Sequence, residues 1–375
     1  MKKGGRGDFP DSPGRQGLQI LPNPPLRKGG TEAGSGKHDC GDFRAQELAE
    51  AARCLKEGGL VAFPTETVYG LGADASNPAA VRRIFAAKGR PADHPLIVHL
   101  PDAGHLERWA RDIPPAAFRL AERFWPGSLT LILRRAPGVP DEVTGGQDTV
   151  GLRVPDHPLA LALLREFGGG VAAPSANRFG RVSPTTAAHV RQELDGRVDR
   201  ILDGGECRVG VESTILSLAG ERPVLLRPGA IPRSALEAVI GEAVATVQNG
   251  TLIRASGTLE SHYAPDARLE LWPPEALEAR IATLIGSGAK VAALVIGAAA
   301  ENRYPPRVRV VSLPEDAAEY AQRLYATLRA LDAAGYDVLL AQAPPEEEAW
   351  HAVRDRLRRA SHPSPLSHPL EKLSV

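Results

Sequence analysis

From Phe43 to Arg359 the chain alternates short apolar runs with longer amphipathic segments, and glycine or proline stands at many of the boundaries. Such apolar runs are typical of buried strands, whereas apolar residues at helical spacing indicate helices that cover a sheet. The alternation predicts an α/β protein. A chain of 375 residues exceeds the usual size of a single hydrophobic core, so we expect two domains.

The first expected domain, residues 41–248, contains a mixed sheet with helices. The pattern predicts strands at residues 60–63, 96–100, 129–133, 171–173, 214–218 and 223–226, and helices at residues 44–57 and 158–167. Two more helices are expected to begin at Asn77-Pro78 and at Ser183-Pro184. Asn and Ser are favoured N-caps, and proline suits the first turn of a helix.

A second expected domain, residues 267–360, follows a polar linker at residues 249–266. Its predicted strands are residues 269–272, 291–296, 308–311 and 338–341, and its predicted helices are residues 274–285, 314–334 and 345–359. This order predicts a small, mostly parallel sheet flanked by helices.

Both ends of the chain are expected to be disordered tails. Residues 1–40 are rich in glycine, proline and basic side chains, and residues 361–375 are rich in Ser, Pro and His. Such segments bury too little apolar surface to offset the entropy of ordering them. The alternative for the N-terminal tail is a basic arm that contacts nucleic acid.

Composition limits the class of partner. Lys plus Arg (45) equals Asp plus Glu (45), so an anionic ligand must meet a local basic patch rather than a net positive charge. Cys40, Cys54 and Cys207 form no Cys-x-x-Cys pair, which fits a reducing compartment. No apolar run is long enough to span a bilayer, and the N-terminus lacks the apolar core of a signal peptide. We therefore expect a cytoplasmic protein without membrane contact.

The familiar nucleotide motifs are weak or missing. G-x-G-x-x-A occurs at residues 70–75 and 168–173. A dinucleotide site needs a strand, a glycine turn and a helix in succession. The second match instead runs into a predicted strand, and the first is separated from its helix. The sequence contains neither a Walker A motif nor His-Glu-x-x-His, so a nucleotide would be bound by another design.

Three polar turns follow predicted strands or helices. Residues 63–70 lie behind a strand, residues 86–91 place Lys88 and Arg90 at a helix end, and residues 172–177 end a buried strand. Taken singly, the two cations could be a C-terminal charge cap, and residues 172–177 could be a plain turn. Together the three turns are typical of the ligand cleft of an α/β protein.

These turns belong to a series of motifs in one order: FPTETVYGLG (63–72), KGRP (88–91), HPLIVH (94–99), WPGSLT (125–130), GLRVP (151–155), APSAN (173–177), STI (213–215) and LRPGAI (226–231). The series resembles the YrdC-like threonylcarbamoyl-AMP synthase family over about 200 residues. SHYAP (261–265) and DRLRRA (355–360) resemble the two-domain branch of that family.

The resemblance implies a fold and a reaction. The fold is a YrdC-like twisted mixed sheet with helices, followed by a smaller Rossmann-like α/β domain. The reaction joins L-threonine, bicarbonate or CO2, and ATP into threonylcarbamoyl-AMP, and it releases pyrophosphate. It is the first step of tRNA threonylcarbamoyladenosine modification, which implies a downstream threonylcarbamoyl-transferase machinery and leaves tRNA contact possible. Mg2+ is expected to be carried mainly by the nucleotide phosphates, with no protein metal ligands.

The resemblance also assigns residues. It implies L-threonine binding by Thr67, His99, Arg153, Ala173 and Ser213. It implies ATP binding by Lys88, Arg90, His94, Thr149, Ser175, Asn177, Ser183, Arg227 and Tyr263. Catalysis is assigned to Lys88, Arg90, Ser175 and Asn177, through positioning and charge neutralisation rather than a covalent nucleophile.

Chemistry supports some of these assignments and leaves alternatives for others. The planar fork of Arg153 suits the threonine carboxylate, and Tyr263 would make the linker a lid over the nucleotide. His99 could instead be a satisfied core histidine. Ser183 could also act as a helix N-cap, and Asn177 could simply hold its turn.

Two rival functions differ in class. An RNA-binding module would need a surplus of exposed basic residues around a cleft, and the balanced charge counts against it. A carbamoyl-transfer domain of the hydrogenase-maturation type shares the YrdC-like fold. Chains of that type also contain an acylphosphatase segment and Cys-rich zinc segments, which three scattered cysteines cannot supply. The sequence does not assign a role to the second domain or an oligomeric state.

Overall fold

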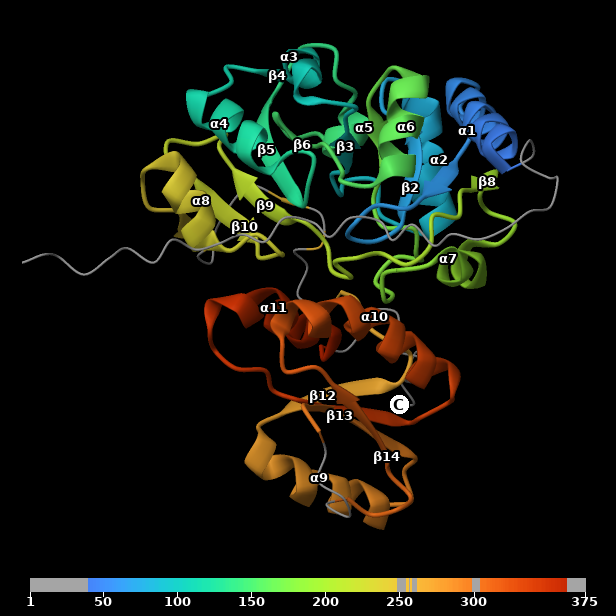
Figure 1. Cartoon of the computed structure of the whole chain (residues 1–375), viewed down its shortest axis with the longest axis vertical. Helices are drawn as coiled ribbons and strands as arrows, with labels where there is room; N and C mark the ends of the chain where they lie inside the picture. Colours follow the sequence, from blue (N-terminus) through green and yellow to red (C-terminus); the bar gives the residue numbers. More distant parts are fainter. Residues whose placement is uncertain (1–39, 248–253, 256, 258–261, 299–303, 363–375) are drawn as a thin grey trace, which may run out of the picture.

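A computed structural model describes residues 40–247, 254–255, 257, 262–298 and 304–362 (Figure 1). The expected tails lie outside this range apart from Cys40, Ser361 and His362, and so does much of the expected linker. Within the described ranges, no helix combines the length and the apolar character that a bilayer crossing requires.

The first domain is built on an 11-stranded mixed sheet. Its strands are β1 (Val61–Phe63), β2 (Gly70–Asp74), β3 (Ile97–His99), β4 (Ala110–Arg111), β5 (Leu129–Arg135), β6 (Thr149–Arg153), β7 (Val171–Ala172), β8 (Arg200–Ile201), β9 (Thr214–Ser217), β10 (Val224–Arg227) and β11 (Ala245–Thr246). Their order is β11-β10-β9-β5-β6-β3-β7-β2-β1-β8, and β4 pairs with β5. The pairs β3–β6 and β5–β9 are parallel, whereas β5–β6 and β3–β7 are antiparallel. The expected mixed sheet is confirmed.

Helices cover this sheet (Figure 1). They are α1 (Cys40–Lys56), α2 (Pro78–Lys88), α3 (Leu106–Trp109), α4 (Pro115–Phe124), α5 (Asp141–Thr144), α6 (Pro158–Phe167), α7 (Ala187–Leu194) and α8 (Arg233–Ile240), with a 3-10 turn at Ala103–His105. The start of α2 follows the sequence expectation, because the Asn77 side chain accepts hydrogen bonds from the backbone of Ala79 and Ala80. The helix ends at Gly89, whose φ of 62° is a left-handed conformation that suits glycine.

The expectation that a helix begins at Ser183-Pro184 is wrong. Helix α7 begins at Ala187, and its N-cap is Thr186, whose side chain accepts a hydrogen bond from the His189 amide. The Ser183 hydroxyl is engaged elsewhere, because it donates to the buried Glu212 carboxylate at 2.6 Å. A long-range partner has replaced the local capping role.

The second domain has a four-stranded, fully parallel sheet in the order β12-β15-β13-β14. Its elements are β12 (Arg268–Trp272), α9 (Pro274–Gly286), β13 (Val291–Ile296), β14 (Arg309–Leu313), α10 (Ala317–Ala333), β15 (Val338–Gln342), a 3-10 turn (Glu348–Trp350) and α11 (His351–Ala360). The expected parallel sheet is confirmed. Two helix starts differ from expectation, since Asp316 caps α10 and the 3-10 turn precedes α11.

Helices α10 and α11 lie between the second sheet and the first domain, whereas α9 covers the opposite face (Figure 1). The contact is close at Gly210, which has a φ of 78°. A Cβ atom there would lie 2.4 Å from the Gln322 Cα atom in α10 and 2.5 Å from the Ala321 carbonyl oxygen. Only glycine fits between the domains at this point.

We expect Gly210→Ala to weaken the docking of the domains. The new methyl group would collide with the α10 backbone and would also sit at an unfavourable positive φ. Gly196→Ala is the matched control, because Gly196 has a φ of 70° but open space around its Cβ position. Thermal unfolding should show a midpoint several degrees lower for Gly210→Ala than for Gly196→Ala. Equal midpoints would contradict the close contact.

Candidate active site

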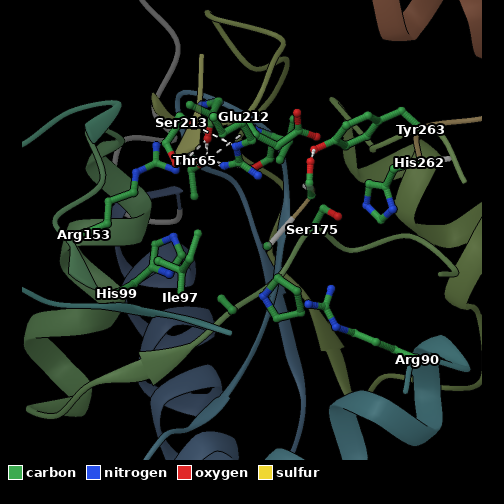
Figure 2. Close-up of a pocket in the computed structure, with 17 residues that line it drawn as sticks. Thr65, Arg90, Ile97, His99, Arg153, Ser175, Glu212, Ser213, His262 and Tyr263 are labelled. Atoms are coloured by element: carbon green, nitrogen blue, oxygen red, sulfur yellow. Dashed lines mark hydrogen bonds between the residues drawn. The ribbon is translucent and has the colours of Figure 1, made fainter. Parts of the chain in front are cut away.

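A buried cavity of about 40 Å³ lies between residues at the strand ends of the first sheet and the linker residues Gly257, His262 and Tyr263 (Figure 2). Nine of the residues expected from the sequence line it: Thr67, Arg90, His99, Arg153, Ala173, Ser175, Ser213, Arg227 and Tyr263. The volume is roughly three times the minimum for one water molecule. The closed cavity therefore has room for a small ligand but not for a nucleotide.

Strand ends bring these residues together. His99 ends β3 and Arg153 ends β6, and the two are register partners in this parallel pair. Arg227 ends β10, and Ser213 comes directly before β9. Ala173 directly follows β7. Backbone that leaves a sheet places its side chains at the sheet edge, so residues far apart in sequence form one wall.

Arg153 is fixed by three hydrogen bonds. It donates to the Glu66 carboxylate at 2.6 Å, to the Thr67 hydroxyl at 2.9 Å and to the Gly127 carbonyl at 3.2 Å. A guanidinium has five N–H donors, so two of them have no partner in the part of the chain that the structure describes. Burial alone would raise the pKa of Glu66, but the Arg153 cation outweighs burial and holds that pKa below its usual value.

Two more buried arginines line the cavity. Arg227 donates to the Ser213 carbonyl at 3.0 Å and to the Ser213 hydroxyl at 3.1 Å. Arg90 donates to the Pro95 carbonyl at 2.9 Å, while its Nε atom has no partner among the described residues. Burial lowers the pKa of Arg90 to about 10, so it still carries its charge at neutral pH. In Figure 2, Arg90 and Arg153 approach the cavity from opposite sides.

The cavity wall therefore holds three buried guanidinium groups. Buried charges are costly unless they are paired or have a ligand to meet. Glu66 pairs with Arg153 but does not line the cavity, whereas Glu212 is the acidic residue that lines it. This excess of positive charge makes the cavity suited to anions.

His99 is neutral in this environment. Burial first, and then the nearby Arg153 cation, lower its pKa to about 3. Its Nδ1 atom is buried without a hydrogen-bond partner in the described ranges, and its ring meets Phe63 edge to face at 5.9 Å. A satisfied core histidine would have its ring nitrogens hydrogen-bonded, so the geometry favours a ligand-binding role for the imidazole.

Lys88 and Asn177 do not line the cavity. The Lys88 ammonium donates to the Ser175 carbonyl at 2.5 Å and to the Asn177 carbonyl. Burial and the neighbouring Arg90 lower the pKa of Lys88 well below its usual value. The Asn177 amide donates to the carbonyls of Arg178 (2.7 Å) and Arg181 (2.8 Å). In the closed state both residues hold the turn that carries Ser175.

His94, Thr149 and Ser183 also lie outside the cavity wall. His94 packs edge to face against Phe179 at 5.4 Å. Thr149 begins β6 and pairs with Arg134 in the sheet. Their expected roles in nucleotide binding stay predictions.

Tyr263 and His262 close the cavity from the linker. Tyr263 is 1% exposed and has a φ of 64°, which is rare for a bulky residue. Its ring stacks on Tyr325 at 5.8 Å and meets His262 edge to face at 4.4 Å. The His262 amide donates to the Arg359 carbonyl at 3.3 Å. The Ala264 amide donates to the Gly180 carbonyl of the first domain at 2.9 Å, so both domains hold the linker in place.

The sequence pattern missed four buried residues at the site: Glu66, Glu212, His262 and Arg356. Glu66 lies inside a quoted motif, directly before Thr67, and Glu212 lies directly before Ser213. Arg356 lies three residues after Val353 and four before Ala360, which puts it on the apolar face of α11. A charged residue on the apolar face of a helix indicates a buried partner, so the sequence of α11 already indicates one for Arg356.

The described residues offer no set of metal ligands. No group of three or more His, Cys, Asp or Glu side chains within these ranges could hold a metal ion. The charged side chains that line the cavity are mainly cationic, and cations do not suit Mg2+.

Comparisons with known proteins agree with this architecture. The Sua5/YciO/YrdC family model, described as "Telomere recombination", matches residues 53–229. The model for the "Threonylcarbamoyl-AMP synthase, C-terminal domain" matches residues 231–362. Threonylcarbamoyl-AMP synthase of Pyrococcus abyssi is 45% identical over 83% of this chain and 93% of its own. That of Bacillus subtilis is 44% identical over 84% and 93%.

Solved structures give the same result. Pyrococcus abyssi Sua5 complexed with L-threonine is 43% identical, with a TM-score of 0.78 over 84% of this chain and 94% of its own. A variant of the same protein, with a histidine and the following tyrosine changed to alanine, matches equally well with a TM-score of 0.78. These matches define an enzyme of the nucleotidyl-transfer type. The chain belongs to the two-domain Sua5/YrdC family of threonylcarbamoyl-AMP synthases.

The buried neutral His99 predicts a pH-dependent stability. Its folded pKa of about 3 lies below its unfolded value of 6.5, so the unfolded chain binds one more proton between these values and stability falls as pH drops through this window. Between pH 6 and 4, His99→Asn should therefore lose less stability than wild type, by about 1.4 kcal/mol per pH unit. Denaturant unfolding at several pH values measures this. A difference between the two proteins that does not change with pH would contradict it.

Proposed function

We propose that this protein makes L-threonylcarbamoyl-AMP in the cavity described above, from L-threonine, bicarbonate or CO2, and ATP, with release of pyrophosphate. The observation that carries the proposal is the convergence of Arg90, Arg153 and Arg227 on one closed cavity. Every substrate except CO2 is anionic or carries a carboxylate, and such groups are the natural ligands of buried guanidinium.

Threonine would bind at the wall formed by Thr67, His99, Arg153, Ala173 and Ser213. The two unused N–H donors of Arg153 would hold the carboxylate as a bidentate pair. Glu66 fixes the guanidinium plane beforehand, which lowers the entropy cost of binding. The L-threonine complex of Pyrococcus abyssi Sua5 supports an amino-acid site in this fold.

The chemistry needs no covalent nucleophile from the protein. The threonine ammonium group releases one proton, and its nitrogen then bonds to the carbon of CO2 with release of a second proton, which gives a carbamate. Where bicarbonate is the source, it takes up a proton and loses water to supply the CO2. A carbamate oxygen then attacks the α-phosphorus of ATP, and the bond to pyrophosphate breaks. Nearby arginine cations favour the deprotonated amine and neutralise the charge that builds up on the phosphates.

ATP would occupy the side of the cavity under Tyr263. Arg90 and Arg227 would meet the phosphates, and Lys88, His94, Thr149, Ser175, Asn177 and Ser183 would complete the nucleotide site when the cavity opens. Mg2+ would enter as part of the MgATP substrate. Because the closed cavity has no room for a nucleotide, the linker must lift before ATP binds, so residues 262–263 act as a lid.

The product is a mixed anhydride that hydrolyses readily, so a second enzyme must take the threonylcarbamoyl group. We place this downstream transferase, and the tRNA that it modifies, among the partners. We also place the reaction in the cytoplasm, since the described cysteines Cys54 and Cys207 are both free thiols.

The proposal predicts the effect of removing Arg153. Wild-type protein should release pyrophosphate from MgATP only when both threonine and bicarbonate are present. Arg153→Ala should raise the threonine KM by about 100-fold, since two charge-assisted hydrogen bonds are lost, with a much smaller change in the ATP KM. Arg111→Ala is the control, because Arg111 does not line the cavity and contributes surface ion pairs and one hydrogen bond to the Arg135 carbonyl. Equal loss of both substrates would contradict the assignment.

The lid predicts a second result. Tyr263→Ala removes the ring that covers the cavity and should raise the ATP KM about tenfold, since stacking and closure are both lost. Tyr263→Phe keeps the ring and loses only a 3.4 Å hydrogen bond to the Gly257 carbonyl, so its ATP KM should stay within about twofold of wild type. An unchanged ATP KM in Tyr263→Ala would refute the lid.

A further inference from the structure

The conspicuous group that the proposed reaction does not use is Arg356. It belongs to α11 of the second domain and is fully buried, with 0% exposure. Its Nε atom donates to the Glu212 carboxylate at 2.7 Å. A buried arginine must have partners that compensate its desolvation. Arg356 pairs with Asp355 of its own helix and, across the domain boundary, with Glu212 in the wall of the cavity.

Arg356 also holds the backbone at two points beside cavity residues. It donates to the Glu212 carbonyl at 3.3 Å, next to Ser213, and to the Pro228 carbonyl at 3.1 Å, next to Arg227. One side chain thereby fixes the chain segments that present Ser213 and Arg227 to the cavity.

Tyr325 of α10 assists at the same carboxylate. Its hydroxyl donates to Glu212 at 3.0 Å, and the Ser183 hydroxyl donates to the other oxygen at 2.6 Å. The Glu212 carboxylate therefore accepts hydrogen bonds from three separate segments, and Arg356 supplies the positive charge. Without Arg356, a buried negative charge would face the site that must accept threonine and ATP.

The same two side chains hold the lid. The Arg356 guanidinium lies over the Tyr263 ring at 5.3 Å from its centroid. The Tyr325 ring stacks on Tyr263 with 5.8 Å between the ring centroids. Cation–π and stacking contacts of this kind contribute most when they are desolvated, as here. Glu212 and Tyr263 thus depend on one pair of residues from the second domain.

We propose that Arg356 and Tyr325 are positioning residues for nucleotide binding: the second domain completes the active site by neutralising Glu212 and by seating Tyr263. This inference rests on the proposed synthesis of threonylcarbamoyl-AMP. Neither residue touches the reacting atoms. Their effect reaches the substrate through the charge of Glu212, the backbone beside Ser213 and Arg227, and the closed position of the lid.

The experiment compares ATP KM, kcat and thermal unfolding in variants of the full chain. Arg356→Met should raise the ATP KM about tenfold or more, because Glu212 is left unpaired. Arg356→Met/Glu212→Gln should recover much of that loss, since the repelling charge is gone while Asp355 keeps its pair with Arg359. Tyr325→Phe, which preserves the packing, should raise the ATP KM about threefold with little change in unfolding.

A matched control separates positioning from simple domain adhesion. Glu193 pairs with Arg329 across the same domain boundary at 3.1 Å, and both side chains are about nine-tenths buried. Glu193→Gln should lower the unfolding midpoint yet leave the ATP KM within about twofold of wild type. The variant leaves Arg329 donating to the Ser183 carbonyl, so the Ser183 hydroxyl can still reach Glu212, and it changes no contact of Tyr263.

The outcomes are distinct. If Arg356→Met does not fold, the ATP KM values of Tyr325→Phe and of the double variant test the inference. The inference would be overturned if Tyr325→Phe and the double variant both had the wild-type ATP KM and Arg356→Met showed no defect for the double variant to rescue. An equal KM rise in Glu193→Gln would also overturn it, because any loosening of the domains would then suffice. If wild type itself releases no pyrophosphate with all substrates present, the proposed function fails, and this inference fails with it.

Discussion

One buried carboxylate ties the two domains to the cavity. Glu212 lines the cavity and accepts hydrogen bonds from Ser183, Tyr325 and Arg356. Removing one partner from a buried ion pair costs about 3–5 kcal/mol, so Glu212 is stable only while the second domain is docked. Gly210 permits that docking, because no side chain fits between it and α10. The charge of the cavity wall therefore depends on contacts formed about 110 to 145 residues later in the chain.

The cavity combines positive charge with burial of its lining side chains. Arg90, Arg153 and Arg227 line the buried wall, while His99 stays neutral because its pKa is lowered to about 3. Donors fixed in this way act on developing phosphate charge without reorganising during the reaction. Tyr263 completes the enclosure in a strained left-handed conformation that its stacking partners maintain. In the proposed function, strain and stacking at Tyr263 would let the linker close over the cavity and still open for a nucleotide.

Local signals in the sequence predicted six of the eleven strands described in the first domain and all four described in the second. Long-range pairing, which short-range patterns do not report, limited the rest. The Asn77 cap and the parallel second sheet follow from short-range patterns that the structure confirms. Ser183 has an equally good capping pattern, but a distant carboxylate takes its hydroxyl. The family motifs predicted nine residues that line the cavity, Arg153 among them, and five that lie outside it. They did not predict that Glu66 holds Arg153 or that Arg356 holds Glu212, because such pairs are set by tertiary packing.

The most direct test of the central claim is the identity of the product. Purified protein would be incubated with MgATP, L-threonine and carbon-13 bicarbonate, and the nucleotide products would be separated and weighed by mass spectrometry. The account predicts threonylcarbamoyl-AMP one mass unit heavier than with ordinary bicarbonate, together with an equal amount of pyrophosphate. Pyrophosphate with an adenylate that carries no label, or no adenylate at all while the protein is folded and the substrates are intact, would contradict it.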